Sequence, residues 1–287
     1  MPFLALALVL TSALMHAVWN AIVKAGSDRL AFGWATTAAG AAFGLVVLAV
    51  AGLPPARALP LIFSSGALHA VYMVALTRAY DHGELSLVYP IARGVAPVLA
   101  TAGALWAFHE RLPEPAYAGI GLITVGVLLL GFLSHRAAAS ASRIASAIGW
   151  SLLAAATIAA YTLTDRQGVR LASPASYIGV LFLVLTGFLT AFVTWQRGDA
   201  PWHLIPPARW GALALSGAFS VGAYLLVLAA LSVSRVGYIA ALRETSVLLA
   251  AWVGWRHLGD PQSPRRVVSS GLVALGLVIL IAAAERP

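Results

Sequence analysis

The sequence contains no cysteine and few charged residues. Without cysteine the chain can form no disulfide bond, use no thiol as a catalytic nucleophile and bind no metal through sulfur. Only 10% of the 287 residues are charged, whereas 61% are hydrophobic and the mean hydropathy is +0.89. A soluble domain has about 25% charged residues. This composition excludes an ordinary soluble protein and predicts an all-α integral membrane protein.

The sequence also lacks a cluster of basic residues, although its formal net charge is +8. The lysines and arginines are scattered among the loops and form no stripe of the kind that binds nucleic acid. We interpret them as residues that set the topology and contact anionic lipid headgroups. No two histidines have the spacing of zinc ligands on one helix. We therefore expect no nucleic-acid partner, no metal and no cofactor.

Charged residues, proline and glycine divide the chain into ten apolar segments, each long enough to cross a bilayer as a helix. These segments cover residues 3–23, 31–52, 59–80, 85–107, 115–133, 144–164, 175–195, 209–231, 236–257 and 266–284. The first segment has no positively charged start and stays apolar to its end, so we interpret it as an uncleaved helix. We expect a multi-pass protein embedded in the lipid bilayer.

The two halves of the chain resemble each other. A shift of 150 residues aligns Arg93 with Arg243, and "GLITVGVLLL" with "GLVALGLVIL", including both glycines. A shift of 142 residues aligns Trp19 with Tyr161. Because each half contains five segments, an odd number, the second half must enter the membrane from the opposite side. We predict ten transmembrane helices in two inverted five-helix repeats, residues 1–135 and 136–287. Transporters of this architecture bind substrate near the midplane, between the repeats.

Two segments resemble the drug/metabolite transporter superfamily, specifically its EamA type. The stretch "HERLPEPAYAGIGLITVGVLLLG" (109–131) is similar to the end of a family repeat, and "HAVWNAIVKAG" (16–26) to its first helix. The second repeat departs from the pattern, because "LGDPQSPRR" (258–266) stands where Glu-Arg-Leu is expected. Among relatives, bacterial amino acid exporters, including those for aromatic amino acids, have this length and polar helix content.

The resemblance implies a central cavity lined by the first, third, fourth, sixth, eighth and ninth segments. It implies that the fifth and tenth segments pack or dimerise outside this cavity, so that the protein is a monomer or a homodimer. It also implies cytoplasmic termini in the inner membrane. The positive-inside rule favours the reverse orientation, because more lysines and arginines lie on the side opposite the N-terminus. We follow the resemblance.

The stretch "SLVYPIARGVAPVLATAGALW" (86–106) places an arginine between two prolines within a membrane helix. An arginine near the bilayer centre costs about 2.5 to 3.5 kcal/mol, so it marks a functional site by default. Arg93 and Arg243 each lie within about 5 Å of the middle of their helices. Either guanidinium could bind the carboxylate of an amino acid through two hydrogen bonds. The alternative is structural: Arg243 pairs with Glu244 or a neighbouring helix, and Arg93 binds backbone carbonyls.

Three further residues in these helices suggest movement or coupling. Pro90 and Pro97 each remove an amide donor and free a carbonyl, so we predict a hinge there. Glu244 is, on this interpretation, the only acid near the midplane, and therefore the candidate for proton coupling or for binding a substrate ammonium. The adjacent Arg243 favours the ionised carboxylate and argues against titration.

Polar and aromatic side chains recur at helical spacing within the apolar segments. We predict that the substrate cavity is lined by His16, Trp19, Asn20, His69, Tyr72, Tyr89, Tyr161 and Tyr224. The alternative is that these residues hydrogen-bond between helices or pack as ordinary core residues.

These observations predict an inner-membrane secondary transporter that exports small metabolites, in the first place amino acids, by alternating access. One alternative is an exporter of cationic drugs, which would need a titrating acid. An alternative of another class is a membrane-embedded enzyme that modifies lipids with His16 and His69 as acid and base. The lack of a metal site, a nucleophile set and a soluble domain argues against an enzyme.

Overall fold

A computed structural model describes residues 3–24, 28–132, 140–249 and 264–284, and in these ranges the chain is almost entirely α-helical, without β-strands. The helices are α1 (Phe3–Lys24), α2 (Arg29–Ala51), α3 (Leu59–His82), α4 (Leu85–Phe108), α5 (Glu114–Phe132), α6 (Ala141–Leu171), α7 (Pro174–Arg197), α8 (Trp210–Val233), α9 (Val236–Leu242) and α11 (Pro264–Ala284). Short 3₁₀ helices lie at Ala56–Ala58 (η1), Pro201–Leu204 (η2) and Pro207–Arg209 (η3).

The long helices are apolar enough to cross a membrane. Seven stretches in the described part of the chain have the length and hydropathy of spans: Arg29–Ala51, Ala56–His82, Leu87–Phe108, Ala141–Leu171, Pro174–Arg197, Pro207–Val233 and Val267–Ala284. Two shorter apolar helices cover Phe3–Trp19 and Glu114–Leu130. Large apolar side chains such as Val50, Trp106 and Trp195 point outward, as they would toward lipid. For these residues the prediction of an all-helical, multi-pass membrane protein is confirmed.

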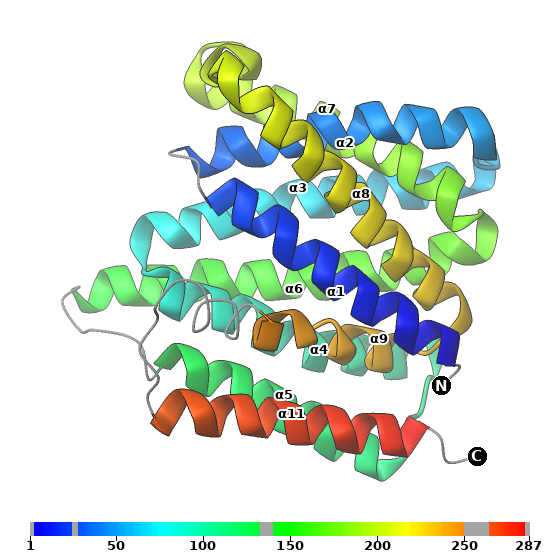
Figure 1. The fold of residues 1–287 in the computed structure, drawn as a ribbon, viewed down its shortest axis with the longest axis vertical. Coiled ribbons are helices and arrows are strands. Elements are labelled where there is room, and N and C mark those ends of the chain that lie inside the picture. The colour runs from blue at the N-terminus through cyan, green and yellow to red at the C-terminus, as the bar shows by residue number, and fades with distance from the viewer. Residues whose placement is uncertain (1–2, 25–27, 133–139, 250–263, 285–287) are drawn as a thin grey trace.

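The helices run back and forth between two ends of a bundle (Figure 1). The start of α1 and the end of α11 lie at the same end, which we call the terminal end, and the other is the distal end. Helix α5 packs along α11 at one edge of the bundle, and α2 packs against α7 near the other edge. Between them, α3 packs along α6, α1 along α8, and α4 against α5, α6 and α9. The helices α4, α6 and α9 therefore meet inside the bundle.

Helix α6 extends beyond the predicted segment of residues 144–164 at both ends. It contains 31 residues and continues to Leu171, through the charged residues Asp165 and Arg166. Both side chains bind groups of the protein itself, as described below, so the helix does not have to end where charges begin. This extension brings an acidic residue into the protein interior.

The ninth segment is interrupted where the sequence has two charged residues. Helix α9 ends at Leu242, Arg243 and Glu244 form a turn, and residues 245–249 are helical again. At the turn the Glu244 amide donates to the Ala241 carbonyl over 3.1 Å, and the Val247 amide to the Glu244 carbonyl over 2.9 Å. These i to i+3 bonds are tighter than those of an α-helix. By contrast, α4 is one continuous helix through Pro90 and Pro97, where we predicted the hinge.

Candidate functional site

An ion pair between α4 and the interrupted ninth segment forms the centre of the candidate site. Arg93 Nη2 lies 3.0 Å from Glu244 Oε1, and the two side chains are only 5% and 3% exposed. The same nitrogen donates a longer hydrogen bond, 3.4 Å, to the Arg243 carbonyl. The Ser246 hydroxyl donates to this carbonyl as well, over 2.9 Å. The break in the helix therefore supplies a backbone acceptor to a buried arginine, which is how irregular backbone is tolerated at membrane depth.

The ion pair leaves two polar atoms unused. Arg93 Nε and Glu244 Oε2 are buried and have no hydrogen-bond partner in the described part of the chain. Beside them is a cavity of about 10 Å³, lined by Arg93, Ala96, Pro97, Ala100, Ile158, Thr162, Ala240, Arg243 and Glu244. A cavity of this size holds about one water molecule. A larger guest requires the surrounding helices to separate.

Arg243 contacts an aromatic ring, whereas Arg93 pairs with a carboxylate. Its guanidinium lies 5.7 Å from the centre of the Tyr224 ring, in a cation–π arrangement. Among the residues that the structure describes, no carboxylate lies within ion-pair distance of Arg243, because its neighbour Glu244 binds Arg93 instead. The interior thus contains one arginine with a counter-charge and one without a counter-charge among the described residues.

Four of the predicted aromatic residues form one cluster next to Arg243. The His69 ring stacks on Tyr161 at 3.7 Å between ring centres, and meets Tyr224 edge to face at 5.1 Å. Tyr161 contacts Tyr72 at 6.1 Å and Tyr224 at 6.2 Å, both edge to face. His69 Nδ1 lies 2.9 Å from the Ser65 carbonyl, to which it must donate. This leaves His69 Nε2 as the acceptor of the ring.

Asp165, which adjoins this cluster, is not among the residues predicted from the sequence. The residue is fully buried in α6, and its Oδ1 accepts a 2.7 Å hydrogen bond from the Tyr177 hydroxyl. Its Oδ2 accepts a hydrogen bond from the Tyr224 hydroxyl. Glu244 is therefore not the only acid in the interior. The available signal was the aspartate itself, but the predicted span of residues 144–164 ends one residue before it.

Of the remaining predicted residues, His16 and Tyr89 lie near the ion pair of Arg93 and Glu244. On α1, Trp19 Nε1 donates to His16 Nδ1 over 3.2 Å, and His16 lies within electrostatic reach of Arg93 and Arg243. Tyr89 lies beside Arg93 and Ser246. Asn20 is in α1, but its side chain is outside the described residues. No group of three potential metal ligands occurs in the described part of the chain.

The terminal end carries a separate ion pair that joins several segments of the chain. Glu110, between α4 and α5, accepts a 3.2 Å hydrogen bond from Arg166 Nε and a 2.8 Å bond from the Val236 amide. Arg166 also donates to the Leu231 carbonyl at the end of α8, over 2.5 Å. Four chain segments are joined in this way, so separating them would break several charge-assisted hydrogen bonds at once.

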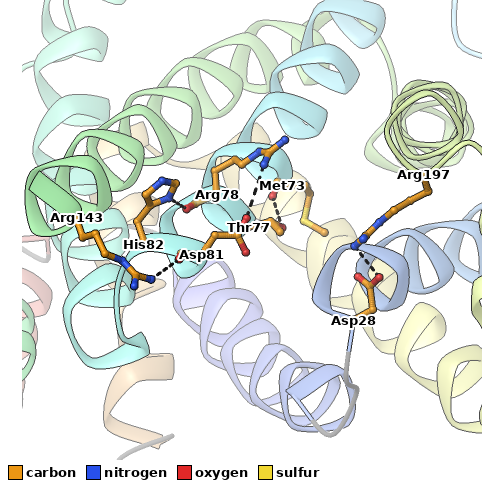
Figure 2. Close-up of polar contacts among 8 residues, drawn as sticks. All are labelled: Asp28, Met73, Thr77, Arg78, Asp81, His82, Arg143 and Arg197. Carbon is orange, nitrogen blue, oxygen red and sulfur yellow. Dashed lines mark hydrogen bonds and ion pairs between the residues drawn. The ribbon is translucent and has the colours of Figure 1, made fainter. Parts of the chain in front are cut away.

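The distal end is more open. A pocket of about 360 Å³ lies between α2, α3 and α7, lined by Asp28, Arg29, Leu30, Val74, Thr77, Arg78, Asp81, Phe192, Gln196 and Arg197. Figure 2 shows that Asp28 and Arg197 face each other, and that Arg78 lies beside Asp81. The ion-pair distances are 2.8 Å between Asp28 Oδ2 and Arg197 Nη2 and 3.9 Å between Arg78 Nη1 and Asp81 Oδ2. Arg143 donates a hydrogen bond to the Asp81 carbonyl. The side chains of both ion pairs are 30% to 56% exposed, so their charges are largely screened by solvent.

Two comparisons with known proteins agree with this arrangement. Residues 145–282 match the EamA-like transporter family. A solved structure, described only as "Crystal structure of protein", has a TM-score of 0.77 and 16% identity, over 98% of each chain. At this identity the likeness concerns the fold alone. No curated protein matches the chain. The family match supports the resemblance to the drug/metabolite transporter superfamily and indicates a multi-pass membrane transporter of small molecules.

Proposed function

We propose that this protein is a secondary transporter that exports amino acids across the inner membrane by alternating access. The observation that carries the proposal is Arg243, a cation inside a membrane-embedded bundle that has no ion-pair partner among the described residues. An unpaired charge at this depth is costly, so it marks a site for a partner. A substrate carboxylate would supply the missing charge and could accept two parallel hydrogen bonds from the guanidinium.

Helix packing supports two inverted repeats of five helices each, residues 1–135 and 136–287. Exchanging the halves converts the contact between α3 and α6 into that between α8 and α1, and both contacts are present. The same exchange maps the contact between α2 and α7 onto itself, and likewise the contact between α5 and α11. Between α5 and α11, Gly119 approaches Gly276, and Gly126 approaches Ser269. The shift of 150 residues exchanges these two contacts as well.

The two ends of the bundle support alternating access. The terminal end is joined by Glu110 and Arg166, whereas the distal end has an open pocket. The cavity beside Arg93 is too small for an amino acid, so binding a substrate there requires the surrounding helices to separate. We expect the interrupted ninth segment to move during transport, because transporter helices that are discontinuous near the site form the binding groups and gates.

Counterflow in proteoliposomes tests the proposal. Vesicles are loaded with an unlabelled amino acid, and uptake of the same labelled amino acid is measured with no ion gradient. A panel of amino acids is compared with the amines that lack the α-carboxylate. We expect the wild type to exchange one or more amino acids and to reject the matching amines. Arg243→Ala should reduce exchange at least tenfold and remove the discrimination, whereas Arg243→Lys should retain part of both.

The control is Arg57→Ala, because Arg57 lies on the exposed 3₁₀ turn η1 and should leave exchange unchanged. Equal exchange by the wild type and a folded Arg243→Ala protein would show that Arg243 does not bind the carboxylate. If no amino acid is exchanged but organic cations are, the protein is a cationic drug exporter and the proposal is wrong.

A further inference from the structure

Asp165 is a buried acid to which the proposed carboxylate site assigns no role. Its side chain is completely shielded from solvent. Within the described ranges no lysine or arginine lies within ion-pair distance of it; its two oxygens instead accept hydrogen bonds from the Tyr177 and Tyr224 hydroxyls. An acid in the apolar interior of a membrane bundle costs free energy through desolvation, so it marks a functional site by default. This environment differs from that of Glu244, whose charge is balanced by Arg93.

The groups around Asp165 come from several helices. Helix α7 contributes Tyr177, α8 contributes Tyr224, and α3 contributes His69, whose ring meets the edge of Tyr224. On α6 itself, Tyr161 lies one turn earlier and stacks on His69. The next residue, Arg166, binds Glu110 and the Leu231 carbonyl.

Two further charged groups face this region, Arg93 on α4 and Arg243 after α9. Arg93 on α4 is paired with Glu244. Arg243, after α9, lies over the face of the Tyr224 ring, whereas Asp165 binds the hydroxyl of the same tyrosine. Tyr224 therefore touches both the proposed carboxylate site and the buried acid.

The two tyrosines allow Asp165 to exist with or without a proton. A hydroxyl group can donate or accept a hydrogen bond. As a carboxylate, Asp165 accepts from both hydroxyls, as the structure shows. As a carboxylic acid, it can donate its proton to the Tyr224 oxygen and still accept from Tyr177. Neither form leaves the acid without a partner, which is the property required of a group that is charged and discharged in each transport cycle.

We propose that Asp165 is the proton-binding residue that couples export to a proton gradient. The inference rests on the proposed function. A proton binds to a carboxylate oxygen of Asp165 while the interior is open to the side with more protons, and the same O–H bond breaks when the interior opens to the other side. Substrate bound at Arg243 moves in the opposite direction. Tyr224 connects the two events, because it contacts both side chains.

The experiment separates coupling from substrate binding. In proteoliposomes, counterflow without a gradient reports substrate binding and the conformational change, whereas accumulation driven by an imposed pH gradient also requires proton transfer. We expect the wild type to perform both. Asp165→Asn should keep counterflow within about threefold of the wild type and lose gradient-driven accumulation, because asparagine accepts hydrogen bonds but takes up no proton. Asp165→Glu should restore at least part of the accumulation.

The matched control is Asp199→Asn, the same substitution in the exposed loop after α7, which should keep both activities. Accumulation by Asp165→Asn at the wild-type level would overturn the proposal. Loss of counterflow in a monodisperse Asp165→Asn protein would also overturn it, because Asp165 would then bind substrate. If the asparagine variant does not fold, Tyr177→Phe replaces it, because this variant removes one hydrogen bond to Asp165. We expect the pH dependence of gradient-driven transport to shift, and an unchanged pH dependence contradicts the proposal. Absence of wild-type counterflow would instead refute amino acid transport itself.

Discussion

Arg93 on α4 and Glu244 in the turn after α9 form an ion pair between two segments that are far apart in the sequence, with 3.0 Å between Nη2 and Oε1. The pair occupies the point where the ninth segment is interrupted, and it binds the carbonyl that the interruption exposes. This relationship leaves Arg243, which is adjacent to Glu244 in sequence, without an ion-pair partner in the described part of the structure. Because Glu244 binds Arg93, we assign Arg93 a structural role and propose Arg243 as the residue that binds substrate.

The pair itself predicts a non-additive effect on stability. Replacing only Arg93 or only Glu244 by Met leaves a buried charge without compensation and should lower the free energy of unfolding by about 3 to 5 kcal/mol. The double variant removes both charges and should recover most of this loss. Thermal unfolding of the purified proteins in detergent measures the three values. A double variant that is as unstable as the sum of the two single variants would contradict a direct pairing.

The ion pair at the terminal end predicts a change in accessibility. Glu110→Gln weakens the contacts with Arg166 and with the Val236 amide, so we expect this end to open more often. Because the protein has no cysteine, Ser234→Cys provides a single reporter; Ser234 is 7% exposed and lies two residues before Val236. The rate of labelling by a membrane-impermeant thiol reagent should rise severalfold. Glu114→Gln, at the exposed start of α5, is the control, and equal rates in all three backgrounds would refute a closing role.

Close packing of α5 against α11 predicts opposite effects for two glycines of the same helix. A Cβ atom at Gly276 would lie 2.7 Å from the Gly119 carbonyl oxygen, whereas one at Gly271 would meet nothing within 4 Å. Gly276→Ala should therefore destabilise the protein by about 1 to 3 kcal/mol through overpacking. Gly271→Ala should be neutral or stabilise it by up to about 1 kcal/mol, because alanine favours the helix. Thermal unfolding compares them, and equal effects would disprove the close contact.

The distal end offers a test that separates a helix cap from an ion pair. Asp28 accepts hydrogen bonds of 3.1 Å from the amides of Leu30 and Ala31 at the start of α2, and also pairs with Arg197. Asp28→Ala should lower stability by about 1 kcal/mol, since both interactions are lost. Asp28→Asn keeps a capping oxygen and loses the charge. If asparagine is as harmful as alanine, the exposed ion pair and not the cap supports this end.

Several features could be predicted from sequence because they depend on short stretches of chain. Hydropathy and segment length indicated a multi-pass helical protein, and the described spans confirm this class. Arg93, Arg243 and Glu244 stood out because charge is rare inside apolar segments. Proline, by contrast, was a poor guide to the interruption: α4 continues through Pro90 and Pro97, while the ninth segment breaks without a proline at that point.

Asp165 shows why part of the site could not be predicted. An aspartate that follows an apolar segment has the same sequence signature whether it reaches water or remains inside. Its burial depends on Tyr177 and Tyr224, which come from two other helices and whose positions follow from how those helices pack. Sequence periodicity reports one helix at a time, so it contains no information on this arrangement.

The sequence by itself determined the class of protein, the approximate spans and the charged positions inside them, because the transfer of side chains into a membrane is a local property that adds up along each segment. Only the tertiary structure decided that Glu244 binds Arg93 and not the adjacent Arg243, and that Asp165 is an interior acid. Electrostatic and hydrogen-bond partners are chosen by distances of a few ångströms between helices, and these distances exist only once the bundle has formed.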